Sequence, residues 1–244
     1  MNLKGRVAIV TGSAKRVGQA IALALAKNGA NIAVHYFSSG KEAEKTANQI
    51  RRFGVKAHSI QGDLSQLEEA EKIVSQTLKI FGRVDILVNS ASVYERTNFG
   101  NISGEDWDSH LNINLRAVFF LSQAAAKPMF KKKAGKIINI IDSDVHRPYK
   151  NYLPYLVSKS GLVGLTYCLA KELAPFIQVN GISPGPVMLQ KSWGPKIKEA
   201  IVRTTPLKRI GSPEDIANAV LFCVLGTDFM TGAVIPIDGG QHIA

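Results

Sequence analysis

The chain has 244 residues, of which 45% are hydrophobic, and a formal net charge of +11. This length suffices to bury a sizeable core, and α/β folds of this size commonly form one domain. The N-terminal apolar run breaks at Gly12, and no apolar stretch approaches the ~20 residues that cross a bilayer. We therefore expect one cytoplasmic domain over residues 1–244 with no membrane partner.

The positive charge is not arranged as in a typical nucleic-acid-binding protein. Such proteins concentrate Lys and Arg on a motif or stripe, whereas the one dense run here, Lys131–Lys133 with Lys136, stands at a predicted helix end before a strand. We interpret it as a solvated helix C-terminus, where cations favour the helix dipole. The charge would favour association with an anionic cofactor or substrate, and we expect no nucleic-acid partner.

The cysteines and histidines give no sign of a metal site. Cys168 and Cys223 lie among apolar residues in helix-like segments, without metal-ligand spacing or a disulfide framework, and we interpret both as inert core residues. The five histidines are scattered, with no HExxH pattern. We expect no bound metal.

Short β-branched runs alternate with amphipathic helical patterns along the whole chain. The predicted strands are Val7–Thr11, Asn31–His35, Lys56–Ile60, Asp85–Asn89, Lys136–Ile141, Gln178–Ile182 and Ala233–Ile237. The predicted helices are Val17–Asn28, Lys41–Phe53, Gln66–Phe81, Gly104–Phe130, Pro154–Leu173 and Pro213–Leu225. This order is typical of an α/β, Rossmann-type, doubly wound parallel sheet with helices on both faces. The segment Pro184–Pro206 lacks clear periodicity, and we interpret residues 186–206 as a lid loop.

The turn after the first strand has the character of a phosphate-binding loop. Glycines at a strand-to-helix turn allow a pyrophosphate to approach the backbone, and the helix N-terminus adds free N–H donors. The spacing is not GxGxxG, so an ordinary turn is the alternative. The residues expected to contact a dinucleotide here are Gly12, Ser13, Lys15, Arg16, Val17 and Gly18.

The end of the second strand favours NADPH over NADH. NAD-preferring folds usually place an acid there to bind the ribose hydroxyls, and no acid occurs between Val34 and Gly40. Arg16 in the glycine loop and the hydroxyls of Ser38 and Ser39 suit a 2′-phosphate instead. The expected contacts at this end are Tyr36, Phe37, Ser38 and Ser39.

A phenol and an ammonium stand four residues apart in a predicted helix. Tyr155 and Lys159 share one helix face, and a nearby cation stabilises phenolate, so we expect Tyr155 to exchange protons near neutral pH. The YxxxK pattern alone is weak, but together with the glycine loop it is a strong indication of a catalytic pair.

With these motifs the sequence resembles the short-chain dehydrogenase/reductase family over nearly its whole length. The matching pieces are Thr11–Gly18, Asp63-Leu64, Asn89-Ser90-Ala91-Ser92, Asn114, Tyr155 with Lys159, and Pro184-Gly185. The resemblance implies that Asp63 contacts adenine, that Lys159 holds the nicotinamide ribose, and that Asn114 anchors a water linking Lys159 to solvent. It also implies cofactor contacts at Leu64, Asn89, Ser90, Ala91, Pro184 and Gly185, and a homotetramer built through the two long helices.

Three departures from the general family pattern resemble the pteridine reductases and dihydromonapterin reductases. Asp142 stands thirteen residues before Tyr155, where the family normally has Ser. Arg16 replaces a glycine of the loop, and Asn89–Ser92 replaces Asn-Asn-Ala-Gly and is followed by Tyr94. In that subgroup the Asp replaces the Ser, the Arg contacts the cofactor phosphate, and an aromatic residue at Tyr94 stacks on the pterin. Ser143 cannot simply replace the missing hydroxyl, since successive strand residues face opposite sides.

These features predict NADPH-dependent reduction of a dihydropteridine-type substrate. A ring C=N needs a proton on nitrogen as hydride arrives, and Asp142 beside Tyr155 can relay it. Asp142 as a neutral variation, and Tyr94 as mere packing under a loop, remain the alternatives. The expected substrate contacts are Ser92, Tyr94, Asp142, Leu189 and Trp193, with Leu189 near the position where most of the family has a Thr that touches the nicotinamide amide.

Two other functions are compatible with the same chain. A 3-oxoacyl-thioester reductase, or another carbonyl reductase, would use the basic charge to bind an acidic carrier protein, although the missing Ser counts against it. A non-catalytic NADP(H)-sensing regulator would use the same fold, but its usual mark is a broken catalytic pair, and both Tyr155 and Lys159 are present.

Overall fold

The computed structural model describes residues 1–189 and 194–244. Its centre is a parallel sheet of seven strands in the order β3-β2-β1-β4-β5-β6-β7. The strands are β1 Val7–Val10, β2 Asn31–Tyr36, β3 Ala57–Gln61, β4 Ile86–Asn89, β5 Gly135–Ile140, β6 Ile177–Pro184 and β7 Val234–Ile237. The predicted doubly wound α/β fold is confirmed, and the chain changes winding direction between β1 and β4.

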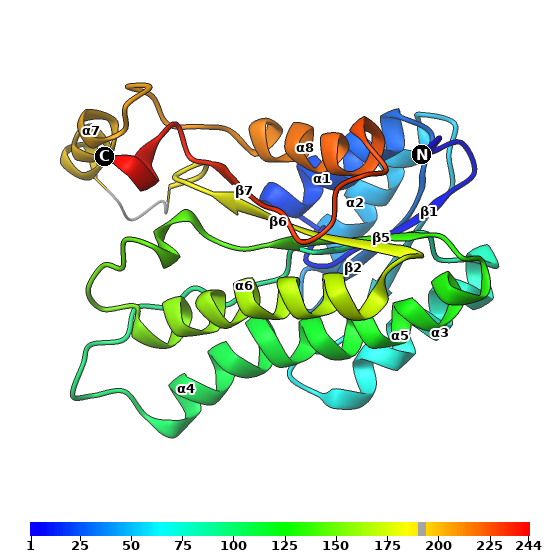
Figure 1. Ribbon diagram of the computed structural model, residues 1–244, viewed down its shortest axis with the longest axis horizontal. Helices are drawn as coiled ribbons and strands as arrows, with labels where there is room; N and C mark the ends of the chain where they lie inside the picture. The colour runs from blue at the N-terminus through cyan, green and yellow to red at the C-terminus, as the bar shows by residue number, and fades with distance from the viewer. Residues whose placement is uncertain (190–193) are drawn as a thin grey trace.

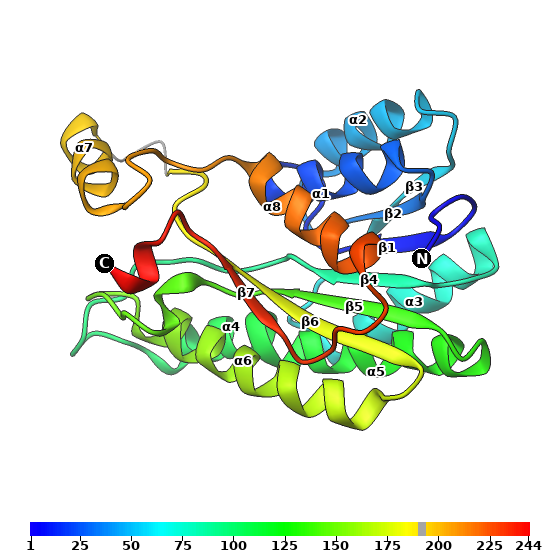
Figure 2. The ribbon, with the colours of Figure 1, turned by 45° about the horizontal axis from the view of Figure 1, so that its top comes forward.

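Helices cover both faces of the sheet (Figures 1 and 2). One face carries α1 Arg16–Lys27, α2 Gly40–Arg51 and α8 Pro213–Leu221, and the other carries α3 Leu67–Phe81, α5 Ala117–Lys131 and α6 Leu153–Leu173. Alternate strand residues enter the two layers: Ala8 and Val10 pack with α1 and α8, while Ile9 packs with α3 and α5. This period of two explains why strands buried on both sides read as continuous apolar runs.

The predicted helix Gly104–Phe130 is interrupted. It consists of α4 Gly104–Leu111, a π-helical turn η1 Asn112–Arg116, and α5. The turn contains the fully buried Asn114, whose side chain bonds to neighbouring segments. The predicted helix Pro213–Leu225 similarly ends in a π-helical turn, η3 Phe222–Gly226. Single π turns inside helices often occur at functional positions.

The expectation of an unstructured loop over residues 186–206 is wrong for its second half. Residues Pro195–Thr204 form helix α7, which begins with Pro195 in its first turn after the N-cap Gly194. Ile197 and Ile201, one turn apart, line a cavity. The helical pattern of these residues in the sequence is weak because the helix is short and none of its residues is buried. Residues 190–193 and the expected contact Trp193 lie outside the described part of the chain.

Two surface interpretations need correction. Lys136 is not solvated: it is 2% exposed on β5, and its ammonium bonds to Thr227 O at 2.9 Å and Asp228 Oδ1 at 2.8 Å, which ties the strand to the segment after η3. Cys168 is exposed on α6, while Cys223 is buried as expected. None of the helices in the described ranges has the length and apolar character of a membrane span.

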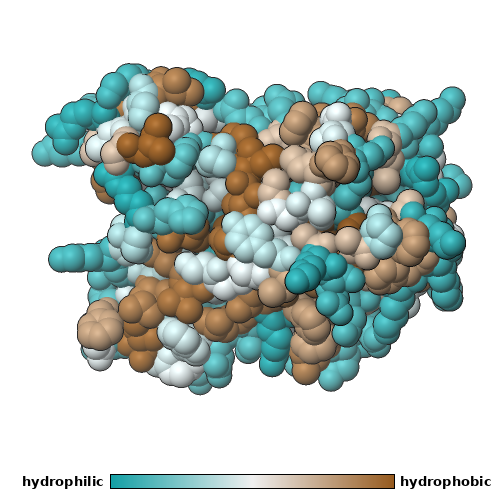
Figure 3. Space-filling model, in the orientation of Figure 1, coloured by the Kyte–Doolittle hydropathy of each residue, from teal (hydrophilic) through white to brown (hydrophobic). Residues whose placement is uncertain are grey.

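The face along β7 and α6 is partly apolar. Brown, hydrophobic side chains lie between pale and teal ones on the face drawn in Figure 3. The exposed large apolar residues include Tyr167 on α6, Phe222 at the start of η3 and Phe229 before β7. The short helical turn η4 Gln241–Ile243 follows β7 and ends the chain beside the turn η2 Ser143–Val145, which follows β5.

Candidate active site

A cavity of about 490 Å³ opens at the carboxyl ends of the central strands. In open α/β sheets, ligands bind at this edge where the strand order reverses. The cavity is lined by Arg16, Val17, Tyr94, Asp142, Asp144, Arg147, Tyr149, Tyr152, Tyr155, Gly185, Pro186, Val187, Met188, Leu189, Ile197, Ile201, Thr204 and Gln241. The expected residues Arg16, Tyr94, Asp142, Tyr155 and Leu189 therefore meet in one place, whereas Ser92 is not among the lining residues.

Tyr155 and Asp142 form the shortest polar contact in this cavity. The Tyr155 hydroxyl donates to Asp142 Oδ2 at 2.5 Å, and the Asp144 backbone N–H donates to Asp142 Oδ1 at 2.9 Å. Burial raises the pKa of the Asp142 carboxyl, although the hydrogen bonds from Tyr155 and Asp144 and the charge of Lys159 act in the opposite direction. The pair can thus hold or pass a proton next to the cavity.

Lys159 lies beneath this pair. Its ammonium is buried, donates to Ile140 O at 2.8 Å, and lies 5.8 Å from the Tyr155 ring centroid. Burial lowers the pKa of Lys159 to about 8, against the raising effect of Asp142. The pKa of Tyr155 is raised well above its usual range, first by burial and then by the charge of Asp142. The expected lowering of the phenol pKa by Lys159 is therefore not found in this arrangement, and Tyr155 is a neutral hydrogen-bond donor.

Asn114 connects two segments of the site through its side chain. Its Oδ1 accepts from Val93 N at 2.8 Å and from the Ser92 hydroxyl at 3.1 Å, and its Nδ2 donates to Val93 O and the Ser158 hydroxyl, both at 3.0 Å. Ser158 in turn donates to Tyr155 O at 2.6 Å. All four bonding positions of the amide are thus filled by protein groups, and the water expected at Asn114 stays a prediction.

The glycine loop is a tight turn held by a buried histidine. Gly12 has φ +63° and donates its N–H to His35 Nδ1 at 3.2 Å, while His35 Nε2 lies 3.2 Å from Gly62 O. A side chain at Gly18 would place its Cβ only 2.5 Å from Gly12 O. Burial lowers the pKa of His35 to about 4, so the ring is neutral and accepts the Gly12 N–H.

Two cations of the loop point to different places. Lys15 Nζ donates to the Ser39 hydroxyl at 3.0 Å, at the end of β2. Arg16 has φ +60°, and its Nε lies 3.1 Å from Met188 Sδ beside the cavity. The structure therefore places Lys15 at Ser39. Arg16, whose backbone is left-handed, lies instead beside Met188 in the segment that follows β6, away from the serine with which the sequence groups it.

The remaining expected cofactor residues border the same edge of the sheet. Phe37 is 60% exposed after β2, and Asp63 caps the turn after β3 by accepting from Ser65 N at 2.9 Å. The N–H groups of Ser90 and Ala91 donate to Thr11 Oγ1, both at 2.9 Å. The other positions are half-buried Tyr36, exposed Ser38, buried Leu64 and Asn89, and half-buried Pro184 and Gly185.

An aromatic wall lines the cavity on the side of α6. Tyr94 stacks on Tyr152 with ring centroids 4.6 Å apart and meets the edge of Tyr155 at 4.7 Å. Tyr149 donates from its hydroxyl to that of Tyr94 at 3.1 Å. One face of Tyr94 is thus occupied by Tyr152. Tyr149 and Tyr152 are not among the residues predicted from the sequence, although the three-residue spacing of tyrosines 149, 152 and 155 is a signal.

Several polar lining residues were also missed. Asp144 and Arg147 come from η2 and the segment after it, and Gln241 comes from the C-terminal turn. Arg147 donates to Gln241 O at 3.2 Å, which joins these two segments. Burial, followed by the charges of Asp142 and Asp238, raises the pKa of Asp144 to about 7. No local pattern marks these residues, because the fold alone brings them together.

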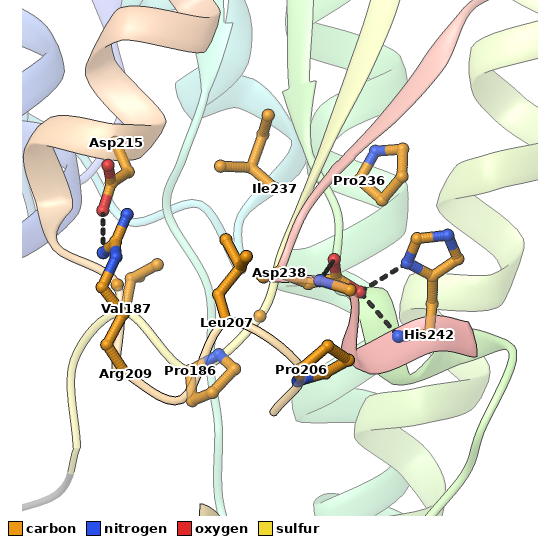
Figure 4. A pocket seen from close by; sticks show the side chains of 14 residues that line it. Pro186, Val187, Pro206, Leu207, Arg209, Asp215, Pro236, Ile237, Asp238 and His242 are labelled. Atoms are coloured by element: carbon orange, nitrogen blue, oxygen red, sulfur yellow. Dashed lines mark hydrogen bonds and ion pairs between the residues drawn. The ribbon is translucent and has the colours of Figure 1, made fainter. Parts of the chain in front are cut away.

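A second cavity, of about 450 Å³, adjoins the first. The segment Gly185–Val187 lines both. Figure 4 shows Asp238 of this second cavity held against His242, with His242 Nδ1 at 2.7 Å and His242 N at 2.8 Å from Asp238 Oδ2. At the other end, Arg209 pairs with Asp215 at 3.1 Å.

The sheet, the glycine loop and the Tyr155–Lys159 pair define a nicotinamide-dependent oxidoreductase fold. The chain belongs to the short-chain dehydrogenase/reductase family, and a family model described as enoyl-(acyl carrier protein) reductase matches residues 12–242. Members of this family use NAD(P)H as the cofactor.

Individual relatives cover nearly the whole chain. A 3-oxoacyl-(acyl-carrier-protein) reductase from Aquifex aeolicus is 35% identical over 99% of both chains, and an uncharacterised oxidoreductase from Thermotoga maritima is 36% identical over 99% of both. A crystal structure from Sinorhizobium meliloti, provisionally described as a short-chain alcohol dehydrogenase, has a TM-score of 0.94 and 32% identity and covers 100% of this chain and 98% of its own. None of these three proteins is named as a pteridine reductase.

Proposed function

We propose that this oxidoreductase uses NADPH to reduce a C=N bond in a dihydropteridine-type ring. The observation that supports this most is the Tyr155–Asp142 hydrogen bond of 2.5 Å. In the family pattern a Ser at position 142 would donate to a carbonyl oxygen, whereas the Asp142 carboxyl accepts the hydroxyl of Tyr155. A substrate whose reacting edge carries N–H donors and needs a proton on nitrogen suits this site better.

The residues present fit NADPH. The absence of a side chain at Gly18 lets α1 begin in close contact with Gly12, and the N-terminus of α1, which has no side-chain cap, offers backbone N–H donors to a pyrophosphate. At the end of β2, Lys15 and Ser39 are paired and no acid occurs between Val34 and Gly40, a donor set that suits a 2′-phosphate. Lys159, buried beside Tyr155, has ammonium protons left for a ribose hydroxyl.

In the proposed mechanism the chain's own residues handle the proton. Bound NADPH supplies the hydride that adds to the carbon of the C=N bond. Tyr155 donates its hydroxyl proton to the ring nitrogen, and Asp142, whose pKa is raised by burial, returns a proton to Tyr155 across their hydrogen bond. Asp142 then recovers its proton from solvent in the cavity.

The aromatic wall supports a flat ring substrate. Tyr94, Tyr149 and Tyr152 are packed against one another, so their rings are held in place before a ligand binds. Ile197 and Ile201 of α7 provide apolar surface elsewhere in the same cavity. A bicyclic heteroaromatic ring would bury its faces against such surfaces.

Reduction of a 3-oxoacyl thioester is the second candidate. The names of the relatives favour it more directly than they favour the first function, and the net charge of +11 suits an acidic carrier protein. In this reaction Tyr155 would protonate the carbonyl oxygen. The residue at position 142 favours the first function, because Asp142 accepts the Tyr155 hydroxyl and replaces the family Ser that would be a second donor to that oxygen.

An NADPH-oxidation assay of the purified protein separates the candidates. The substrates are dihydrobiopterin, dihydromonapterin, dihydrofolate and an acetoacetyl thioester, each with NADPH and with NADH. We expect the highest kcat/KM with a dihydropterin and NADPH. Turnover of the thioester alone would establish the second function, and NADPH binding without turnover of any substrate would support the NADP(H)-sensing alternative.

A further inference from the structure

Asp144 is a carboxyl in the cavity that the mechanism above does not use. We propose that Asp144 is a specificity-determining residue, whose carboxylate accepts N–H donors from the edge of the substrate ring. This inference rests on the proposed function and adds to it a residue that selects the substrate class.

The backbone around Asp144 is fixed. Its N–H donates to Asp142 Oδ1 at 2.9 Å, which caps the turn η2 and holds the two carboxyl-bearing residues in a defined relation. The carbonyl of Asp144 accepts from Arg147 N at 3.1 Å. The side chain is therefore presented to the cavity from a short, hydrogen-bonded turn rather than from a free loop.

The Asp144 carboxyl has no hydrogen-bond or ion-pair partner among the described residues. Arg147, the cation whose charge acts on it, instead donates to Gln241 O at 3.2 Å. The Asp238 carboxyl is hydrogen-bonded to His242 (Figure 4), and its negative charge raises the pKa of Asp144. Burying a carboxyl in part without a hydrogen-bond partner costs free energy. A ligand that donates N–H groups to Asp144 supplies the missing hydrogen bonds and is bound more tightly for that reason.

The chemistry of the substrate follows from this arrangement. The 2-amino-4-oxo edge of a pterin carries N–H donors, and a charge-assisted bond from such a donor to a carboxylate is about twice as strong as a neutral one. The reacting end of a 3-oxoacyl thioester carries only acceptors and offers no N–H donor to the Asp144 carboxyl. Asp144 thus favours the first class of substrate and disfavours the second.

Two variants test the contact. Asp144→Leu removes the acceptor at similar size, and Asp144→Asn keeps one acceptor oxygen without the charge. We expect the KM for dihydrobiopterin to rise at least tenfold in Asp144→Leu and less in Asp144→Asn, with kcat within about threefold of wild type. The KM for NADPH should not change, and the thermal midpoint should not fall. Asp108→Leu, an exposed aspartate on α4 outside the cavity, is the matched control and should behave as wild type.

Each other result has a defined meaning. An unchanged KM for dihydrobiopterin in Asp144→Leu, while the wild type turns this substrate over, overturns the contact and leaves the proposed function standing. An equal rise of KM for dihydrobiopterin and for NADPH overturns it as well, since it indicates a general disturbance. A wild type that reduces no dihydropterin overturns both the proposed function and the contact.

Discussion

The hydroxyl of Tyr155 donates to Oδ2 of Asp142 at 2.5 Å, while Oδ1 of the same carboxyl accepts from the backbone of Asp144. The carboxyl is therefore oriented by a backbone N–H on one side and by the phenol on the other. Two groups coupled this closely titrate as a unit. Their roles have to be separated by removing one group at a time and measuring binding apart from turnover.

Tyr155→Phe removes only the hydroxyl. We expect NADPH binding to stay close to wild type, because the ring still packs against Tyr94, while kcat falls by at least ~100-fold because the proton donor is lost. NADPH titration by fluorescence and steady-state kinetics measure the two effects. Loss of NADPH affinity with normal kcat would exclude the assigned role. Lys159→Ala is the comparison variant and should reduce both the affinity for NADPH and kcat.

Lys15 and Arg16 should differ in their effect on cofactor preference. Lys15 is paired with Ser39 where a 2′-phosphate would lie, and Arg16 lies beside Met188. We expect Lys15→Met to weaken NADPH binding by about 1.5–3 kcal/mol with little effect on NADH. Arg16→Met, of matched size, should weaken both cofactors alike. If Arg16→Met alone abolishes the preference for NADPH, Arg16 is the phosphate contact, as the sequence predicts, and Lys15 is not.

His35 should make stability depend on pH in the acidic range. The pKa of His35 is about 4 in the folded protein and 6.5 in the unfolded chain. Between these pH values the unfolded chain binds a proton at His35 and the folded protein does not. Stability should therefore fall by about 3 kcal/mol as pH drops from 6.5 to 4 and then level off. The free energy of unfolding of wild type and of His35→Gln is measured in urea across this pH range. The difference between the two proteins isolates the contribution of His35, because the carboxylates contribute equally to each. Parallel pH profiles for the two proteins would contradict it.

The fold was largely predictable from local pattern. Strands such as Val7–Val10 and Ile86–Asn89 are buried on both faces and read as short apolar runs, and the amphipathic helices between them identify the parallel arrangement. Helix α7 was missed because it buries none of its residues. The π turn around Asn114 was missed because it depends on hydrogen bonds to Val93 and Ser158 rather than on helix propensity.

The site was predictable where chemistry follows a fixed spacing. Asp142, Tyr155 and Lys159 meet as expected, because Asp142 follows strand β5 and the other two lie on helix α6 at the same edge of the sheet. Asp144 and Gln241 were not predictable, since only the fold brings the turn after β5 to the C-terminal turn. The pKa of Tyr155 was misjudged because spacing says nothing about burial, which outweighs the charge of Lys159.

The substitution Asp142→Ser tests the central claim most directly, because it removes the carboxyl and restores the hydroxyl of the family pattern. The measurement is kcat/KM for dihydrobiopterin and for an acetoacetyl thioester in wild type and variant, with NADPH affinity and the thermal midpoint as controls. If Asp142 relays the proton, dihydropterin reduction falls by at least ~100-fold, thioester reduction holds or rises, and both controls stay near wild type. A variant that keeps full dihydropterin reduction would contradict the account and would make the thioester reductase the better description of this protein.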